Sequence, residues 1–269
     1  MSERIVTGLY VPGDRPDRFG TAVGSGAQLV IFDLEDAVAP DAKAAALDAV
    51  VDWLHANATA GAELPVLQVR VNAGAEDEIA ALRATGAPVE LRVPKIDDTG
   101  QLDRIAAVAG GLPVTALIES ALGIENAAAI ARHPAVTRVA LGESDLASEL
   151  GTRADAVIDY ARVRLLFAAR AAGLPAPMLS AYPGIRDLDG LRADTERGRR
   201  LGWVGRTAVH PAQLAVIEEV FAPSADEVAW ATAVVEAVER SGGGVATLGS
   251  GEMVDPAMLG RARSILGRP

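Results

Sequence analysis

The chain has 269 residues, with 25 Lys and Arg against 36 Asp and Glu, so its formal net charge is −11. So acidic a chain lacks the overall positive field that gives general affinity for nucleic acid or anionic lipid, and any anionic ligand must be bound by a local group of arginines. The absence of cysteine excludes disulfides and thiolate chemistry, and three histidines in all disfavour an all-histidine zinc site.

Eight short runs rich in Val, Ile and Leu alternate with Ala-rich stretches that carry apolar residues at helical spacing. The runs begin near Ile5, Gln28, Val66, Glu90, Val114, Arg138, Pro177 and Trp203. Helices are predicted between them, for example over residues 44–54 and 102–109. The alternation predicts an α/β fold of βαβ units, and the length fits one (β/α)8 TIM barrel of about 250 residues. The runs read as nearly continuous and apolar, as expected of parallel strands buried on both faces.

Beyond the eighth run, the sequence predicts more helices joined by glycines. One helix has Pro211 near its start, and the next begins at Ser224, which with Glu227 has the spacing of a capping box, and runs to about Arg240. Glycines at 242–244 end it, and a last short helix is expected over 258–266. We therefore expect a TIM-barrel catalytic domain over residues 1–222 and a C-terminal helix and lid extension over residues 223–269. A frayed terminus is the alternative.

Neither a membrane span nor an export signal is expected. No apolar run approaches the ~18 residues that cross a bilayer, and residues 1–4 lack the apolar core of a signal peptide. The sequence is therefore typical of a soluble, cytoplasmic protein.

Charged residues follow the predicted strands, at the end of an α/β barrel where active sites lie. They are Asp33, Glu35, Asp36, Arg70, Lys95, Glu119, Glu143 and Asp145. A single charge there is equally consistent with a structural ion pair. Two carboxylates from adjacent strands, near an arginine and a lysine, favour a site for Mg²⁺ or Mn²⁺ with anchors for an anionic substrate.

The histidines and the common catalytic motifs offer no competing site. The sequence contains no G-x-S-x-G, no G-x-G-x-x-G, no P-loop and no H-E-x-x-H. His210, at the mouth of the last strand, is as consistent with capping or packing as with catalysis. His55 and His133 are expected on the surface, away from the barrel mouth.

Nine motifs in order cover nearly the whole chain. They are LYVPGDRPDRF (9–19), VIFDLEDAVAPDAK (30–43), VRVNAG (69–74), VPK (93–95), LIESALGIENAAAIA (117–131), LGESDLASELG (141–151), DLDGL (187–191), AVHPAQL (208–214) and GEMVD (251–255). With them the sequence resembles the citrate lyase β-subunit-like family, relatives of malyl-CoA and citramalyl-CoA lyases in the HpcH/HpaI aldolase/citrate lyase superfamily. The resemblance implies a Mg²⁺-dependent lyase that splits a 3-hydroxyacyl-CoA, such as citramalyl-CoA, malyl-CoA or citryl-CoA, into acetyl-CoA and a keto acid.

The resemblance also implies roles at the metal. Glu119 and Asp145 match the two metal ligands, and Arg70 matches the arginine that faces the thioester carbonyl and the keto-acid oxygens. An acidic cluster that orients the metal's waters is matched by Asp33, Glu35 and Asp36, of which Glu35 and Asp36 are catalytic candidates together with Arg70.

Further roles concern substrate and lid. Arg15 and Arg18 lie where the family binds CoA or substrate phosphate and carboxylate, and Lys95 is a further candidate for binding substrate or CoA. The chain's only lysines, Lys43 and Lys95, both fall inside family motifs, as expected where a compact ammonium fits and a guanidinium does not. Asp255 matches a lid aspartate that acts as acid–base in the site of an adjacent subunit, which implies a homo-oligomer, a trimer or a pair of trimers.

Several departures from the family pattern leave the substrate open. They are the stretch at residues 75–78, Leu179 and Gly184, the GESD sequence, Arg206 before the HP motif, and Pro256 directly after Asp255. Three alternatives remain beside the lyase. They are a CoA-independent keto-acid aldolase, a malyl-CoA-type thioesterase, and a non-autonomous β subunit of a multi-protein citrate lyase that uses an acyl-carrier protein.

Overall fold

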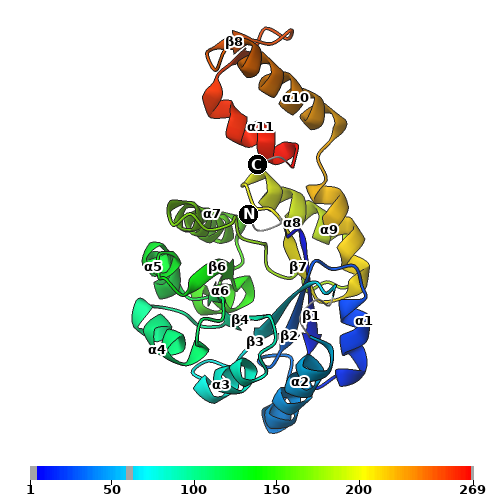
Figure 1. The fold of residues 1–269 in the computed structure, drawn as a ribbon, viewed down its shortest axis with the longest axis vertical. Helices are drawn as coiled ribbons and strands as arrows, with labels where there is room; N and C mark the ends of the chain where they lie inside the picture. Colours follow the sequence, from blue (N-terminus) through cyan, green and yellow to red (C-terminus); the bar gives the residue numbers. More distant parts are fainter. Residues whose placement is uncertain (1–4, 59–62, 268–269) are drawn as a thin grey trace. The chain divides into compact units, whose positions relative to one another are not determined.

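Strands and helices alternate through most of the computed structural model, which describes residues 5–58 and 63–267 (Figure 1). The chain divides into two compact units, Met1–Phe221 and Ala222–Pro269. Residues 1–4, to which the expectation about an export signal refers, lie outside the described part.

Seven parallel strands form one curled sheet in the first unit, in the order β6-β5-β4-β3-β2-β1-β7. Their bounds are β1 Thr7–Pro12, β2 Leu29–Asp33, β3 Val66–Arg70, β4 Val89–Val93, β5 Val114–Ile118, β6 Val136–Leu141 and β7 Arg206–Ala208. The register sets Asp33 opposite Arg70, and Arg70 opposite Arg92. Side chains of β2, β3 and β4 that the sequence separates therefore meet at one level of the sheet.

The run that begins at Pro177 does not form the eighth strand that its sequence predicts. Leu179 makes only an isolated parallel bridge to Arg206, and the Ser180 hydroxyl donates to the Leu141 carbonyl at the end of β6. The prolines at 175, 177 and 183 lack the amide donors that a regular ladder needs. The prediction of eight regular strands is therefore wrong, and a short extended segment stands between β6 and β7.

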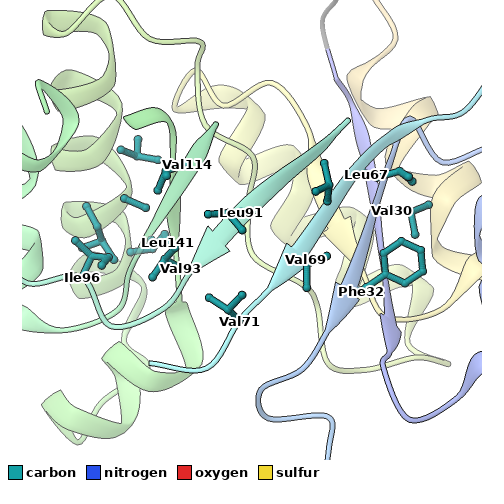
Figure 2. Close-up of a cluster of buried hydrophobic side chains, with 14 of the residues drawn as sticks. Val30, Phe32, Leu67, Val69, Val71, Leu91, Val93, Ile96, Val114 and Leu141 are labelled. Carbon is teal, nitrogen blue, oxygen red and sulfur yellow. The ribbon is translucent and has the colours of Figure 1, made fainter. Parts of the chain in front are cut away.

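Helices cover the outside of this sheet (Figure 1). Their bounds are α1 Phe19–Val23, α2 Lys43–Asn57, α3 Glu76–Ala84, α4 Thr99–Ala109, α5 Ala121–Ala131, α6 Glu143–Leu150, α7 Asp155–Ala171, α8 Leu188–Arg200 and α9 Leu214–Phe221. The helices predicted over 44–54 and 102–109 are confirmed. Figure 2 shows aliphatic side chains of β3 and β4, such as Val69 and Leu91, in the buried hydrophobic cluster.

The side chains of β3 and β4 that point away from this hydrophobic cluster are polar. This differs from the expectation that the strands are nearly continuous apolar runs. Gln68 donates to Glu90 (2.7 Å) and to Thr115 (3.0 Å), and Arg92 Nε donates to Gln68 Oε1 (3.0 Å). Barrel interiors are more often packed with Val, Ile and Leu. In this chain, hydrogen bonds between strands replace part of that packing.

A second polar network joins α6, α7 and α8. The fully buried Arg162 donates to both oxygens of Glu143 (2.8 and 2.9 Å) and to Asp194 (3.0 Å), which also pairs with the buried Arg206. Burial raises the pKa of Asp194, but the hydrogen bonds and charges of the two arginines outweigh it and hold this pKa below its usual 3.8. Arg206, one of the departures from the family pattern, thus has a structural partner.

Replacing Asp194 by asparagine is expected to lower the free energy of unfolding by about 3 kcal/mol at pH 7, because two buried guanidinium groups lose a shared carboxylate. Since the folded-state pKa of Asp194 is lowered, its contribution is present above the unfolded value and disappears as the pH falls through the folded value. Urea unfolding from pH 3 to 8 should therefore show a constant deficit above pH 5 that shrinks below pH 3.8. The exposed Asp189 on the same helix is the control. If Asp189→Asn lowered the free energy of unfolding by as much as Asp194→Asn, Asp194 would not owe its effect to the two buried arginines.

The second unit has its own small core. Helix α10, Ala225–Arg240, begins with the predicted capping box between Ser224 and Glu227, and α11 spans Leu259–Ile265. Gly242 and Gly243 end α10 with positive φ angles of 69° and 88°, which glycine adopts without strain. Between α10 and α11 lies a short antiparallel hairpin, β8 Ala246–Thr247 and β9 Met253–Val254, which was not predicted from the sequence. Over both units, no helix in the described residues is long and apolar enough to cross a membrane.

Candidate functional site

A pocket of about 410 Å³ lies at the carboxyl ends of the strands. Its lining includes five residues of the predicted site: Asp33, Asp36, Arg70, Glu119 and Asp145. They come from β2, β3, β5 and α6 or the loops beside them, so the topology brings together residues that lie more than 100 positions apart in the chain. The charged side chains therefore meet at the carboxyl ends of the strands, where the sequence predicts the functional site.

Arg70 is held by three carboxylates. Its Nε and Nη2 donate to the two oxygens of Asp33 (2.7 and 2.6 Å), and its Nη1 lies 2.9 Å from Glu35 and 3.3 Å from Asp36. Burial opposes the charge, but the hydrogen bonds and charge of Asp33 outweigh it and raise the pKa of Arg70. Three of its five N–H groups make hydrogen bonds to Asp33 and Asp36; of the other two, one on Nη1 lies within ion-pair distance of Glu35, and one on Nη2 has no acceptor among the described residues and remains for a ligand.

Glu35 is a buried carboxylate with incomplete partners. Neither of its oxygens accepts a hydrogen bond of normal geometry from the described chain, although Arg70 and Lys95 lie within ion-pair distance. Burial raises the pKa of Glu35, and the charge of Arg70 offsets part of that rise. Both oxygens are buried and Glu35 does not line the pocket, so it acts on the site through its charge beside Arg70 and Lys95.

Glu119, which follows β5, is 5% exposed, and no Lys or Arg of the described residues forms an ion pair with it. The backbone N–H of Lys95 donates to its Oε1 (2.8 Å). Burial, the charge of Glu35 and the charge of Asp145 raise the pKa of Glu119 to about 7. This repulsion between carboxylates is what a bound cation would relieve.

The residues present fit a magnesium ion. The described chain holds no group of three or more His, Asp or Glu side chains arranged to bind a metal. Mg²⁺ commonly takes only one or two carboxylates and completes its shell with water and substrate oxygens. The unpaired Glu119 and the exposed Asp145, both in this pocket, are such a pair.

Gly142, just before α6, allows Glu119 to lie against the start of that helix. A Cβ at position 142 would lie 2.5 Å from the Glu119 Cβ and still closer to its carboxylate. Gly142→Ala is therefore expected to displace Glu119 and weaken Mg²⁺ binding at least about tenfold, with a larger loss of activity than of thermal stability. Calorimetric titration with Mg²⁺ tests this, and unchanged affinity would contradict it. Gly20→Ala is the control, since a Cβ there meets nothing within 4 Å.

The two lysines have different positions. The Lys43 ammonium donates to the carbonyls of Leu34 and Glu35 (3.0 Å each) and to Asn72 (2.6 Å), so it fixes the loop after β2. Lys95 has a positive φ of 56° and a side chain that is 55% exposed, with Nζ 3.3 Å from Glu35. Lys43 therefore stabilises the site, and Lys95 extends from its edge into solvent.

The other sequence candidates lie outside the pocket lining. Arg15 pairs with its neighbour Asp17 (2.8 Å), and Arg18 is exposed. His210 accepts from the N–H of Ala212 and so caps a short 3-10 helix, Pro211–Gln213. His55 is exposed as expected, but the expectation for His133 is wrong.

The His133 side chain is only 10% exposed. It lies after the end of α5, beside Asp103, and accepts from the N–H of Ala135.

Asp255 lies in the second unit. Its side chain accepts from the N–H of Ala257 (2.9 Å) and caps a 3-10 helix, Pro256–Met258. The residue is thus part of a structured segment, while its proposed role rests on the resemblance.

Among the pocket residues that sequence reasoning missed are Tyr10 and Arg92. The guanidinium carbons of Arg70 and Arg92 lie 5.3 and 5.8 Å from the centre of the Tyr10 ring. The signal for Arg92 was its place in an alternating strand, VELRV, which sets it on the same face as Glu90.

Comparison with known proteins gives consistent results. The profile of the HpcH/HpaI aldolase/citrate lyase family matches residues 6–211. A (3S)-malyl-CoA thioesterase of Cereibacter sphaeroides is 38% identical over 270 residues, 97% of this chain and 93% of that protein. A citrate lyase subunit beta-like protein of Deinococcus radiodurans is 33% identical over 273 residues, 96% of this chain and 95% of that protein.

A solved structure also matches over almost the full length. The protein CitE of Mycobacterium tuberculosis, in complex with magnesium, acetoacetate and coenzyme A, superposes with a TM-score of 0.82 at 30% identity and covers 98% of both chains.

Proposed function

Because the chain belongs to the HpcH/HpaI aldolase/citrate lyase family, we propose that it is a Mg²⁺-dependent carbon–carbon lyase that cleaves a 3-hydroxyacyl-CoA into acetyl-CoA and a keto acid. The observation that carries the proposal is the pocket in which Glu119, without a protein cation, lies with Asp145 and Arg70. Citramalyl-CoA, malyl-CoA and citryl-CoA are the candidate substrates.

Glu119 and Asp145 are the residues that would hold the metal. Mg²⁺ bound there would polarise the hydroxyl and carboxylate oxygens of the substrate. The CitE structure, a relative with 30% identity in complex with magnesium and coenzyme A, supports magnesium as the metal.

The chain's own residues account for the charge that develops in a retro-Claisen cleavage. The substrate hydroxyl gives its proton to a base, for which Asp255 is the candidate, and becomes a carbonyl. The bond between C2 and C3 breaks, and its electrons pass to the thioester as an enolate. The N–H on Arg70 Nη2 that has no protein acceptor would donate to the thioester oxygen as that charge appears. Asp33, Glu35 and Asp36 fix the guanidinium beforehand, so little reorganisation is required.

The outer residues complete the proposed site. Arg15, Arg18 and Lys95 are cations near the carboxyl ends of β1 and β4 that would meet the phosphates of CoA. Asp255, in the second unit, would return a proton to the enolate carbon in a neighbouring subunit, and the enzyme would then be a trimer or a pair of trimers. Sedimentation equilibrium tests the assembly, and an active monomer would contradict it.

Thioester hydrolysis is the second candidate, and the relatives named (3S)-malyl-CoA thioesterase favour it. The same pocket would hold the substrate, but water would attack the thioester carbonyl and release free malate and CoA. The two reactions consume the same substrate and differ in their products.

Product analysis decides between them. The purified protein is incubated with malyl-CoA, citramalyl-CoA and citryl-CoA, with Mg²⁺ or with EDTA, and the products are separated by chromatography. Acetyl-CoA with a keto acid supports the lyase, and free hydroxy acid with CoA supports the thioesterase. Turnover of the free hydroxy acids alone would indicate a CoA-independent aldolase. Turnover only of acyl-carrier-protein thioesters would indicate a subunit of a multi-protein lyase.

A further inference from the structure

Arg92 is a buried cation in the lining of the pocket that also contains Asp33, Glu119 and Asp145. It belongs to β4 and pairs in register with Arg70 on one side and Thr115 on the other. Its side chain lines both the main pocket and a small cavity of about 20 Å³ beneath it, which Gln68, Thr115 and Arg138 also line. Arg92 therefore separates the pocket from the polar interior of the sheet.

The guanidinium of Arg92 lacks a negative partner. The residue is 5% exposed, yet none of the described carboxylates forms an ion pair with it. Its Nε donates to Gln68 Oε1, and its guanidinium carbon lies 5.8 Å from the centre of the Tyr10 ring. The four N–H groups on Nη1 and Nη2 have no acceptor in the described chain.

The two neighbouring arginines, unlike Arg92, have carboxylate partners. Arg70 is neutralised by Asp33, Glu35 and Asp36, and Arg138 pairs with Glu90. A buried charge is costly unless it is paired, and the aromatic contact with Tyr10 compensates only part of that cost. A ligand with an anionic group beside Arg92 would supply the negatively charged partner that the described residues do not provide.

The lining of the pocket thus includes groups of opposite charge that could bind different parts of one ligand. Glu119 and Asp145 are negative and suit a metal that chelates one carboxylate and the adjacent hydroxyl or keto oxygen of the substrate. Arg92 is positive and presents a planar fork that matches a carboxylate through two parallel hydrogen bonds. A substrate with a single carboxylate would satisfy the metal and leave Arg92 unpaired.

We infer that Arg92 binds a second carboxylate, and that the keto-acid half of the substrate is therefore dicarboxylic, as in citryl-CoA and unlike malyl-CoA and citramalyl-CoA, which each have one free carboxylate. This inference rests on the proposed function, because it takes the first carboxylate to lie at the metal. Arg92 acts as a specificity-determining residue of the same pocket.

Calorimetric titration of the whole protein in the presence of Mg²⁺ tests the inference with two pairs of acids. Malate and lactate differ by one carboxylate, as do oxaloacetate and pyruvate. The wild-type protein should bind the dicarboxylic member at least about tenfold more tightly, as expected for a charge-assisted hydrogen-bonded pair. Arg92→Met should bring both members to the affinity of the monocarboxylic acid and leave that affinity unchanged.

Two further variants control for folding and for general charge. Arg92→Lys keeps the charge but loses the planar fork, so its preference for malate over lactate should fall between those of the wild type and Arg92→Met. Arg153→Met removes an exposed arginine that lines a different pocket and should preserve the full preference. Circular dichroism and thermal unfolding of each variant verify that it is folded.

The outcomes separate the inference from the proposed function. Equal, Mg²⁺-dependent binding of malate and lactate by the wild type would overturn the inference and leave the lyase proposal standing. If Arg92→Met lowered the affinity for malate and for lactate by the same factor, the inference about Arg92 would be overturned as well. Failure of all four acids to bind in the presence of Mg²⁺ would overturn both.

Discussion

Replacing Glu119 by glutamine is expected to lower Mg²⁺ affinity and kcat/KM by at least about 100-fold, since even residues that only support a metal ligand contribute 10- to 100-fold. Glutamine keeps the oxygen that accepts from the Lys95 N–H, so the side chain retains its place. It removes the negative charge that is proposed to hold the metal. Calorimetric titration with Mg²⁺ and steady-state kinetics with the active thioester measure the two effects.

The metal-free Glu119→Gln protein should be at least as stable as the wild type. Glu35 and Asp145 repel the ionised Glu119, and a neutral amide removes that repulsion. A lower melting temperature without metal would mean that Glu119 serves the fold rather than the metal. Glu125→Gln is the matched control, because Glu125 lies on the helix after the same strand with its side chain 61% exposed. It should leave affinity and activity unchanged.

The location of this site could be predicted from sequence because it depends on local patterns. Each strand candidate ends in polar residues, and parallel strands place those ends at one edge of the sheet. Glu119 and Asp145 needed only that rule and the family motifs to be placed together. The capping box at Ser224 is equally local, since it depends on a spacing of three residues.

Features that depend on contacts between residues far apart in the sequence could not be predicted from local patterns. The failure of the strand after Pro177 follows from prolines, whose effect on a ladder depends on which N–H groups the neighbouring strands require. The pairing of Asp194 with both Arg162 and Arg206 depends on how α7, α8 and β7 pack.

The charges of the two pocket arginines show the same dependence on partners. Arg70 is neutralised and Arg92 is not, although both occupy alternating positions of adjacent strands. The difference arises because β2 ends in Asp33 beside Arg70, while Arg92 has Thr115 of β5 on its other side. A sequence pattern shows the direction of a side chain along a strand, whereas its charge partner is set by the neighbouring strand.

Replacing Arg70 by methionine is expected to have two large effects with different causes. The free energy of unfolding should fall by about 3–5 kcal/mol, because Asp33 and Glu35 remain buried without their main cation. The value of kcat/KM should fall by about 10²- to 10³-fold, because the N–H proposed to donate to the thioester oxygen is lost. Urea unfolding and steady-state kinetics with saturating Mg²⁺ measure the two quantities separately.

The double variant Asp33→Asn, Arg70→Met distinguishes the two roles of Arg70. Neutralising Asp33 removes a buried charge that Arg70 no longer compensates, while the amide oxygen can still accept from the N–H of Glu35. Part of the stability should therefore return, whereas activity should remain at the level of the single variant. If activity returned with stability, Arg70 would act only by positioning the acidic loop, and the donor to the thioester oxygen would have to be another group. Arg70→Lys should lie between the wild type and Arg70→Met in stability, because one ammonium cannot hold three carboxylates in the fixed geometry of a guanidinium.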